Sequence, residues 1–184
     1  MSLFNVKKAI NRLNIDICLI TDFFFIFSIF EYALKEGGFL TSKYGYAQSD
    51  WEEFCKTIEG KFQELLNQPN NNSLIEAREF LVSQPPMRQI VNGRRTDFEP
   101  ITVADSDSES FTISKWIGCI RNNLFHGGKY PYGNTRNPLL IRSAIVILAA
   151  WARLDNNVER KLIETGLIAD DSTDQVGLFP NQFS

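Results

Sequence analysis

Histidine and cysteine are scarce in this chain of 184 residues, which has one histidine and three cysteines. Cys18, Cys55 and Cys119 are far apart and form no CxxC pair, and a single histidine cannot complete a Cys2His2 site. We therefore expect neither a metal centre nor a cofactor. Each cysteine lies among apolar neighbours at helical spacing, so we expect reduced core thiols in a cytoplasmic protein.

The chain also lacks a strong excess of charge of one sign. Its 19 basic and 22 acidic side chains give a formal net charge of -3 and are spread along the sequence. This balance argues against a strongly basic nucleic-acid binder. It leaves RNA open as a substrate, because a local basic site is enough for a transient complex.

Long hydrophobic runs are missing as well. The most apolar segment, residues 17–30, is interrupted by Asp22 and bracketed by Asp16 and Glu31. A membrane-spanning helix needs about 20 predominantly apolar residues, and no basic leader with a small-residue cleavage site precedes this segment. Because the segment is apolar on all sides, we expect a buried helix, covered either within a bundle or by a second copy of the chain.

What the chain does contain is material for helices around a core, with 43% hydrophobic residues and 15 phenylalanines. Apolar residues recur at three- and four-residue steps, which predicts main helices over 6–35, with a possible break near Asn14, and over 51–66, 108–126 and 137–154. Shorter helices are expected over 73–82 and 157–164. A polar loop containing Tyr44 and Tyr46 follows the first helix, which Gly37 and Gly38 end.

Local signals predict where several helices begin and end. Ser49 with Glu52, and Ser73 with Glu76, have the spacing of capping boxes. Asn137 and Pro138 are typical of an N-cap and a first helical residue. Pro85 and Pro86 stop the preceding helix.

The expected fold is all-α, an antiparallel bundle of four main helices plus short helices, in a single domain over 1–184. Residues 84–107 form an insertion too short for its own core, in which Asn92-Gly93 predicts a small hairpin. We expect 165–184 to be a loosely structured tail.

One segment carries candidate chemistry, RNNLFHGGK at residues 121–129. At 100° per residue, Arg121 lies at the edge of the apolar face of its helix, while Asn122 and His126 share a stripe that points away from the core. A guanidinium binds phosphate through paired hydrogen bonds. An imidazole can accept a proton from a 2′-hydroxyl or donate one to a leaving 5′-oxygen near neutral pH. Asn122 could orient the histidine or hold the phosphate, and Lys129 and Tyr130 offer a cation and a stacking surface.

Two readings of this segment remain open from the residues alone. An isolated arginine and histidine on a helix usually form a salt bridge and a cap. If the segment is catalytic, one histidine supplies a base or an acid but not both, so a symmetric dimer would bring two copies together.

The same nine residues resemble the signature of the HEPN superfamily, an arginine followed by a polar residue and then a histidine four to six positions on. The segment FEYALK at 30–35 also resembles a stretch common in the first long helix of such proteins. The resemblance implies a compact helical bundle, usually homodimeric, often with metal-independent endoribonuclease activity in toxin–antitoxin or other defence systems. An antitoxin protein is then a candidate partner, beside RNA or a nucleotide.

Carried over to this chain, the resemblance makes Arg121 and His126 catalytic and Asn122 supportive. It makes Glu31 a weaker candidate for a substrate contact. Asn123, Lys129 and Tyr130, in and after the same helix, are the other candidate substrate contacts. For Glu31, a structural role as partner to an arginine is an equal alternative. Members modified by a nucleotidyltransferase carry a tyrosine two residues after the histidine, where this chain has Gly128, so we do not expect that partner. A non-catalytic RNA- or nucleotide-binding module, and a structural dimerisation domain, remain alternatives to the ribonuclease.

Overall fold

The computed structural model describes residues 8, 12, 15–43, 45–125 and 136–170. Its first long helix, α2 (Ile17–Glu36), begins after Asp16, whose side chain accepts a hydrogen bond from the Cys18 N–H. The helix ends at Gly37, whose N–H donates to the Ala33 carbonyl, and Gly38 follows with φ 106°. The predicted glycine end is therefore confirmed. The part of that predicted helix before Ile15 lies almost wholly outside the described residues.

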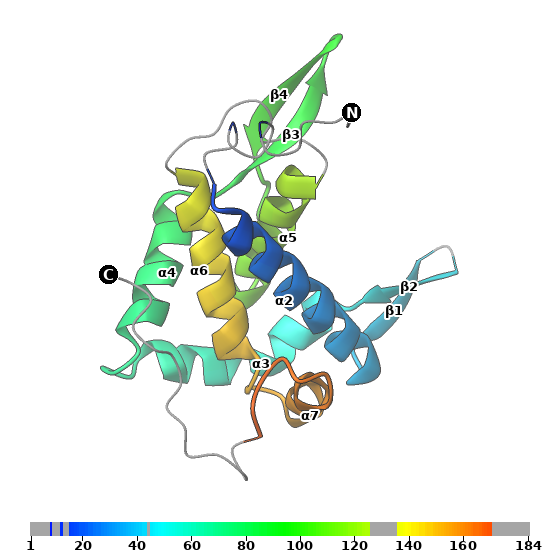
Figure 1. Ribbon diagram of the computed structural model, residues 1–184, viewed down its shortest axis with the longest axis vertical. Coiled ribbons are helices and arrows are strands. Elements are labelled where there is room, and N and C mark those ends of the chain that lie inside the picture. Colours follow the sequence, from blue (N-terminus) through cyan, green and yellow to red (C-terminus); the bar gives the residue numbers. More distant parts are fainter. Residues whose placement is uncertain (1–7, 9–11, 13–14, 44, 126–135, 171–184) are drawn as a thin grey trace.

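The remaining helices are α3 (Trp51–Leu66), α4 (Asn72–Ser83), α5 (Glu109–Phe125), α6 (Arg136–Trp151) and α7 (Asn156–Glu164). Two antiparallel hairpins, β1 (Leu40–Lys43) with β2 (Tyr46–Ser49) and β3 (Met87–Asn92) with β4 (Arg95–Pro100), interrupt the helices. The described chain is thus mostly helical with two small sheets. In Figure 1, α6 lies between α2 and α4, and both of these helices pack against it.

Rings from several helices meet in the core. Phe54 of α3 contacts the rings of Phe30, Phe39, Trp51 and Trp151 at centroid distances of 5.7, 5.3, 6.2 and 6.2 Å. Phe54 and Trp151 are fully buried. These tilted and edge-to-face arrangements are the favourable ones for aromatic pairs. The ring network therefore joins α2, α3 and α6.

The helix α2 is buried along one side only. Phe23, Phe27 and Phe30 lie in the core, whereas Phe24 and Phe25 are 43% and 55% exposed. Of the two expected ways of covering this helix, complete coverage within the chain is therefore wrong, and coverage by a second copy stays a prediction. With 20 residues and a mean hydropathy of 1.9, α2 is also long and apolar enough to cross a membrane, a property that it shares with core helices of soluble proteins. Helices α6 and α7, which are joined at a sharp bend, are long and apolar enough to cross a membrane only if the two together form one span.

The first hairpin replaces the predicted polar loop. Leu40 pairs with Ser49 and Lys43 pairs with Tyr46, while Gly45 adopts φ 80° in the turn. The strands are exposed, with no alternation of apolar and polar residues, so their sequence carried no strand signal. The second hairpin was predicted, and Gly93 at φ 64° lies in its turn. Figure 1 shows both hairpins projecting from the helices.

Helix starts differ from the predicted caps. Asp50, not Ser49, caps α3 by accepting from the Glu53 N–H, and the Ser49 hydroxyl donates instead to the Glu31 carbonyl. Helix α4 begins after Asn71 with no side-chain cap, so the second capping box is wrong too. Helix α6 begins at Arg136, which makes Asn137 a buried helical residue and not an N-cap. Pro85 and Pro86 do follow the end of α4, as predicted.

Leu167 and Ile168 pack against the core, so the tail predicted to be loosely structured is ordered at its start. Residues 171–184 lie outside the described residues.

Two of the predicted core cysteines, Cys55 and Cys119, are buried, but Cys18 is exposed, and all three are free thiols. Burial raises the pKa of Cys55 to about 12, so its thiol stays protonated.

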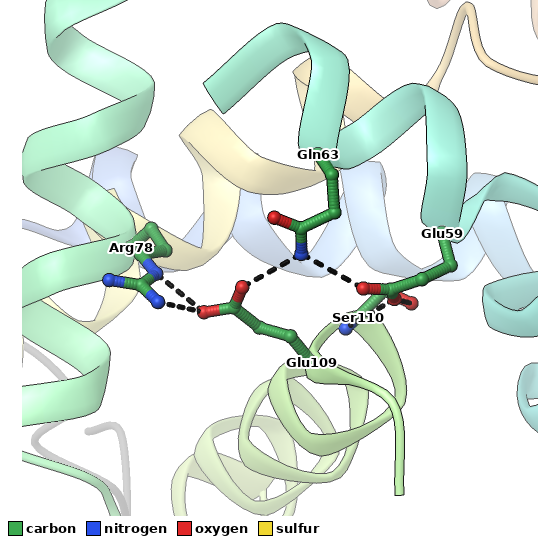
Figure 2. Close-up of polar contacts among 5 residues, drawn as sticks. All are labelled: Glu59, Gln63, Arg78, Glu109 and Ser110. Carbon is green, nitrogen blue, oxygen red and sulfur yellow. Dashed lines mark hydrogen bonds and ion pairs between the residues drawn. The ribbon is translucent and has the colours of Figure 1, made fainter. Parts of the chain in front are cut away.

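A polar cluster joins α3, α4 and α5 (Figure 2). The Gln63 amide donates to one oxygen of Glu59 and one of Glu109, each at 2.9 Å. Arg78 forms an ion pair with Glu109. Glu59 also accepts from the Ser110 N–H at 3.0 Å and from the Ser110 hydroxyl, in the first turn of α5. The cluster thereby provides an acceptor for the Ser110 N–H, one of the backbone donors that have no partner within the helix at its N-terminus.

This cluster predicts acid-sensitive stability. Burial opposes ionisation of Glu59, but hydrogen bonds from Ser110 and Gln63 outweigh it and lower the pKa of Glu59 below its ordinary 4.5. A carboxyl with a lowered folded-state pKa contributes stability above its unfolded pKa and loses it as pH falls through the folded value. We expect Glu59→Gln to lower the melting temperature at pH 7, and we expect this deficit to shrink as the pH falls toward 3.

The control is Glu64→Gln, because Glu64 is exposed on the same helix and forms no hydrogen bond or ion pair within the described part of the chain. Thermal denaturation between pH 3 and pH 7 measures both variants. A Glu59→Gln deficit that stays constant over this range would contradict the assigned role of the carboxylate.

Candidate functional site

The candidate residues lie near the end of α5. Trp116, Ile117 and Ile120 of this helix are buried, while Arg121 is half-buried and Asn122 is exposed. The predicted placement of Arg121 at the edge of the apolar face and of Asn122 on the outer face is therefore confirmed. The described part of the helix extends to Phe125. His126, Lys129 and Tyr130, three of the residues proposed from the sequence, lie outside the described residues.

An open pocket of about 340 Å³ lies beside Arg121 and Asn122. Its walls come from α2, the start of α3 and one face of α5. The lining residues are Phe27, Glu31, Trp51, Phe111, Ser114, Lys115, Gly118, Arg121 and Asn122. Three residues predicted from the sequence, Glu31, Arg121 and Asn122, are thus brought to one site from helices distant in the chain.

The Arg121 guanidinium is held by uncharged groups. Its Nη1 donates to Asn122 Oδ1 at 2.9 Å, and its Cζ lies 5.7 Å from the centroid of the Phe27 ring. Among the described residues, no carboxylate forms an ion pair with it. Cation–π contact and one amide hydrogen bond fix the plane of the guanidinium but leave most of its five donors unused. The predicted alternative of a structural salt bridge gains no support from these contacts.

Glu31 lies on α2, one helical turn beyond Phe27. Its carbonyl accepts the Ser49 hydroxyl at 3.0 Å, which ties this turn of α2 to the end of β2. Its side chain lines the same pocket as Arg121, yet the two form no ion pair in the described structure. The pocket therefore presents one carboxylate and one guanidinium that are both accessible to a ligand.

A second cation, Lys115, lines the pocket and was missed by the sequence analysis. Its Nζ lies 2.6 Å from Asp107 Oδ2 and 4.3 Å from the centroid of the Phe111 ring. Hydrogen bonds from Lys115 and from the Ala104 N–H hold the pKa of Asp107 below its usual range, so the Asp107 carboxylate stays ionised at neutral pH. The stripe of Lys115, Gly118 and Asn122, at steps of three and four, was the available signal.

Asn123 is buried and links α5 to the start of β3. It is 4% exposed, and its Nδ2 donates to the Met87 carbonyl at 2.7 Å. Cys119, one turn earlier on α5, donates its thiol to the same carbonyl at 3.4 Å. These contacts hold the start of β3 against α5, and Asn123 does not line the pocket. Of the two predicted substrate contacts among the described residues, Glu31 therefore lines the pocket and Asn123 does not.

No group of three or more metal-ligating side chains comes together among the residues that the structure describes. Comparison of the chain with family models, curated proteins and solved structures gives no match.

Proposed function

We propose that this chain is a metal-independent endoribonuclease of the HEPN type. The observation that carries the proposal is the pocket in which Arg121 and Asn122 of α5 meet Glu31 of α2. Arg121 has no acidic partner among the described residues, so its donors are available to an anion such as a phosphodiester. His126 follows the last residue of α5 directly in the sequence.

In the proposed reaction, a base takes the proton of a ribose 2′-hydroxyl and the 2′-oxygen attacks the adjacent phosphorus. The bond to the 5′-oxygen breaks, and an acid protonates that oxygen, which leaves a 2′,3′-cyclic phosphate. Arg121 stabilises the charge that develops on the phosphoryl oxygens. His126 transfers protons near neutral pH. Asn122 orients Arg121 through the hydrogen bond between their side chains.

The single histidine of each chain leads us to propose a homodimer that supplies a second one. The exposed stripe of Cys18, Phe25 and Tyr32 on α2 is the candidate dimer surface, since these residues recur at seven-residue steps. We further propose that α2, α3, α5 and α6 form the four-helix bundle implied by the resemblance. A cytoplasmic toxin–antitoxin or defence system, with an antitoxin protein as partner, is the proposed setting.

A second candidate function is an RNA- or nucleotide-binding module without turnover. Glu31 counts against turnover, because a carboxylate in the same pocket as Arg121 opposes the build-up of further negative charge on a phosphodiester in the transition state. The net charge of -3 points the same way.

One oligonucleotide distinguishes the two candidates. We expect the protein in EDTA to cleave a strand of 2′-O-methyl nucleotides only at a single ribonucleotide placed within it, because only that position has an attacking hydroxyl. The measurement is the length and the terminal phosphate of the products. Tight binding without cleavage, over several sequence contexts, would favour the binding module and reject the ribonuclease.

A further inference from the structure

Phe24 and Phe125 form an aromatic cluster one helical turn beyond two lining residues of the pocket, Phe27 on α2 and Arg121 on α5, and neither ring lines the pocket itself. The rings of Phe24 and Phe125 meet at a centroid distance of 5.3 Å with an interplanar angle of 64°. They are 43% and 42% exposed, respectively. Exposed aromatic side chains that gather in this way often mark a binding site.

The cluster continues the two helical stripes that line the pocket. On α2, Phe24 lies three residues before Phe27 and seven before Glu31, which places all three on one face. On α5, Phe125 lies four residues after Arg121 and three after Asn122. The two rings therefore extend the pocket wall beyond the guanidinium.

From this arrangement we propose that Phe24 and Phe125 form a stacking platform for a nucleobase next to the phosphate bound by Arg121. Arg121 and Phe125 are one helical turn apart, about 6 Å along the axis. A ribose spans a comparable length between a phosphate and its base. The inference rests on the proposed function in taking single-stranded RNA as the ligand.

Two features of the pocket favour a nucleotide over a second copy of the chain at this cluster. Its volume of about 340 Å³ is in the range of small-ligand sites. Arg121, one helical turn from Phe125, has no acidic partner in the described structure. A protein surface that buried this guanidinium would leave its charge unpaired. RNA supplies the missing anion together with a planar base, and bases stack on aromatic side chains with little regard to sequence.

The platform is tested by binding, so that cleavage does not enter the result. The probe is a 2′-O-methyl hexanucleotide, which has no attacking hydroxyl, and a second probe lacks the base at one central position. We expect Phe125→Leu and Phe24→Leu each to weaken binding of the intact probe about tenfold, equivalent to about 1.4 kcal/mol. Leucine keeps apolar volume and removes the flat ring.

The matched control is Phe98→Leu, which removes an exposed ring of β4 outside the pocket and should leave the affinity unchanged. Wild type should bind the base-free probe about as weakly as Phe125→Leu binds the intact one. Equal affinity of wild type and Phe125→Leu for the intact probe, or no binding by wild type, would overturn the platform. So would a dimer-to-monomer change in sedimentation of Phe125→Leu with unchanged binding, because the rings would then be a subunit contact.

Failure of the platform and failure of the ribonuclease give different results. Ring-dependent binding of the hexanucleotide with no cleavage of RNA would keep the platform and reject the catalytic proposal. Metal-free cleavage of RNA with ring-independent binding would keep the ribonuclease and reject the platform.

Discussion

Replacing Arg121 with alanine is expected to lower the rate of RNA cleavage by about 10²- to 10³-fold. A loss of this size is typical when one preorganised donor that stabilises transition-state charge is removed. Arg121 is held over Phe27 and by Asn122, without an acidic partner in the described structure, so its hydrogen bonds are free to strengthen as charge develops on the phosphate. Single-turnover kinetics with a labelled RNA measure the effect.

Two further variants make this result specific. Arg121→Lys keeps the charge but loses the paired donors and the flat face over Phe27, so we expect an intermediate rate. Arg160→Ala removes the same charge from an exposed position on α7 outside the pocket and should leave the rate unchanged. An Arg121→Ala variant as active as Arg160→Ala would show that the guanidinium does not take part in the reaction.

Replacing Phe54 with alanine is expected to destabilise the fold by about 3–5 kcal/mol. Its ring is fully buried and contacts four other rings from three helices and the segment before β1. The truncation removes buried apolar surface and leaves a cavity that the surrounding rings cannot easily fill. For a chain of this length we expect a fall in melting temperature of about 10 °C.

Val91→Ala is the control for this substitution, since Val91 is 80% exposed on β3. We expect it to change stability by no more than about 0.5 kcal/mol. Urea denaturation of both variants gives the comparison. Similar midpoints for Phe54→Ala and Val91→Ala would contradict the placement of Phe54 at the centre of the core.

The sequence was sufficient to predict the main helices, because their signals are periodic and long. Phe54, Ile58 and Phe62 recur along α3 at the spacing that buries one helical face, and all three are buried. Helix ends were less predictable, since several nearby side chains compete for the same orphan donors. Asp50 caps α3, whereas the hydroxyl of the neighbouring Ser49 donates a hydrogen bond to the Glu31 carbonyl.

The short hairpin β1–β2 and the exposed side of α2 could not be predicted. Strands of four exposed residues carry no apolar alternation, and the pairing of Lys43 with Tyr46 depends on the turn at Gly45. The run of phenylalanines in α2 indicates a buried helix, but sequence alone does not say how much apolar surface the other helices can cover. Phe24 and Phe25 remain exposed.

The site was predictable in part. The position of Arg121 and Asn122 on α5 follows from helical geometry, and Glu31 was proposed through the family resemblance. That these residues share a pocket depends on the packing of α2 beside α5, which is a tertiary property. The same packing brings in Trp51 and Lys115, which the sequence analysis missed, and turns Asn123 toward the Met87 carbonyl.

The most direct test of the proposed ribonuclease is incubation of a mixed-sequence RNA with purified protein in EDTA. His126→Ala and Arg121→Ala variants of matched melting temperature are assayed beside the wild type. We predict cleavage by the wild type alone, with 2′,3′-cyclic phosphate ends on the products. Equal inactivity of all three proteins over a broad panel of RNAs, or equal activity of all three, would contradict the catalytic role of this site.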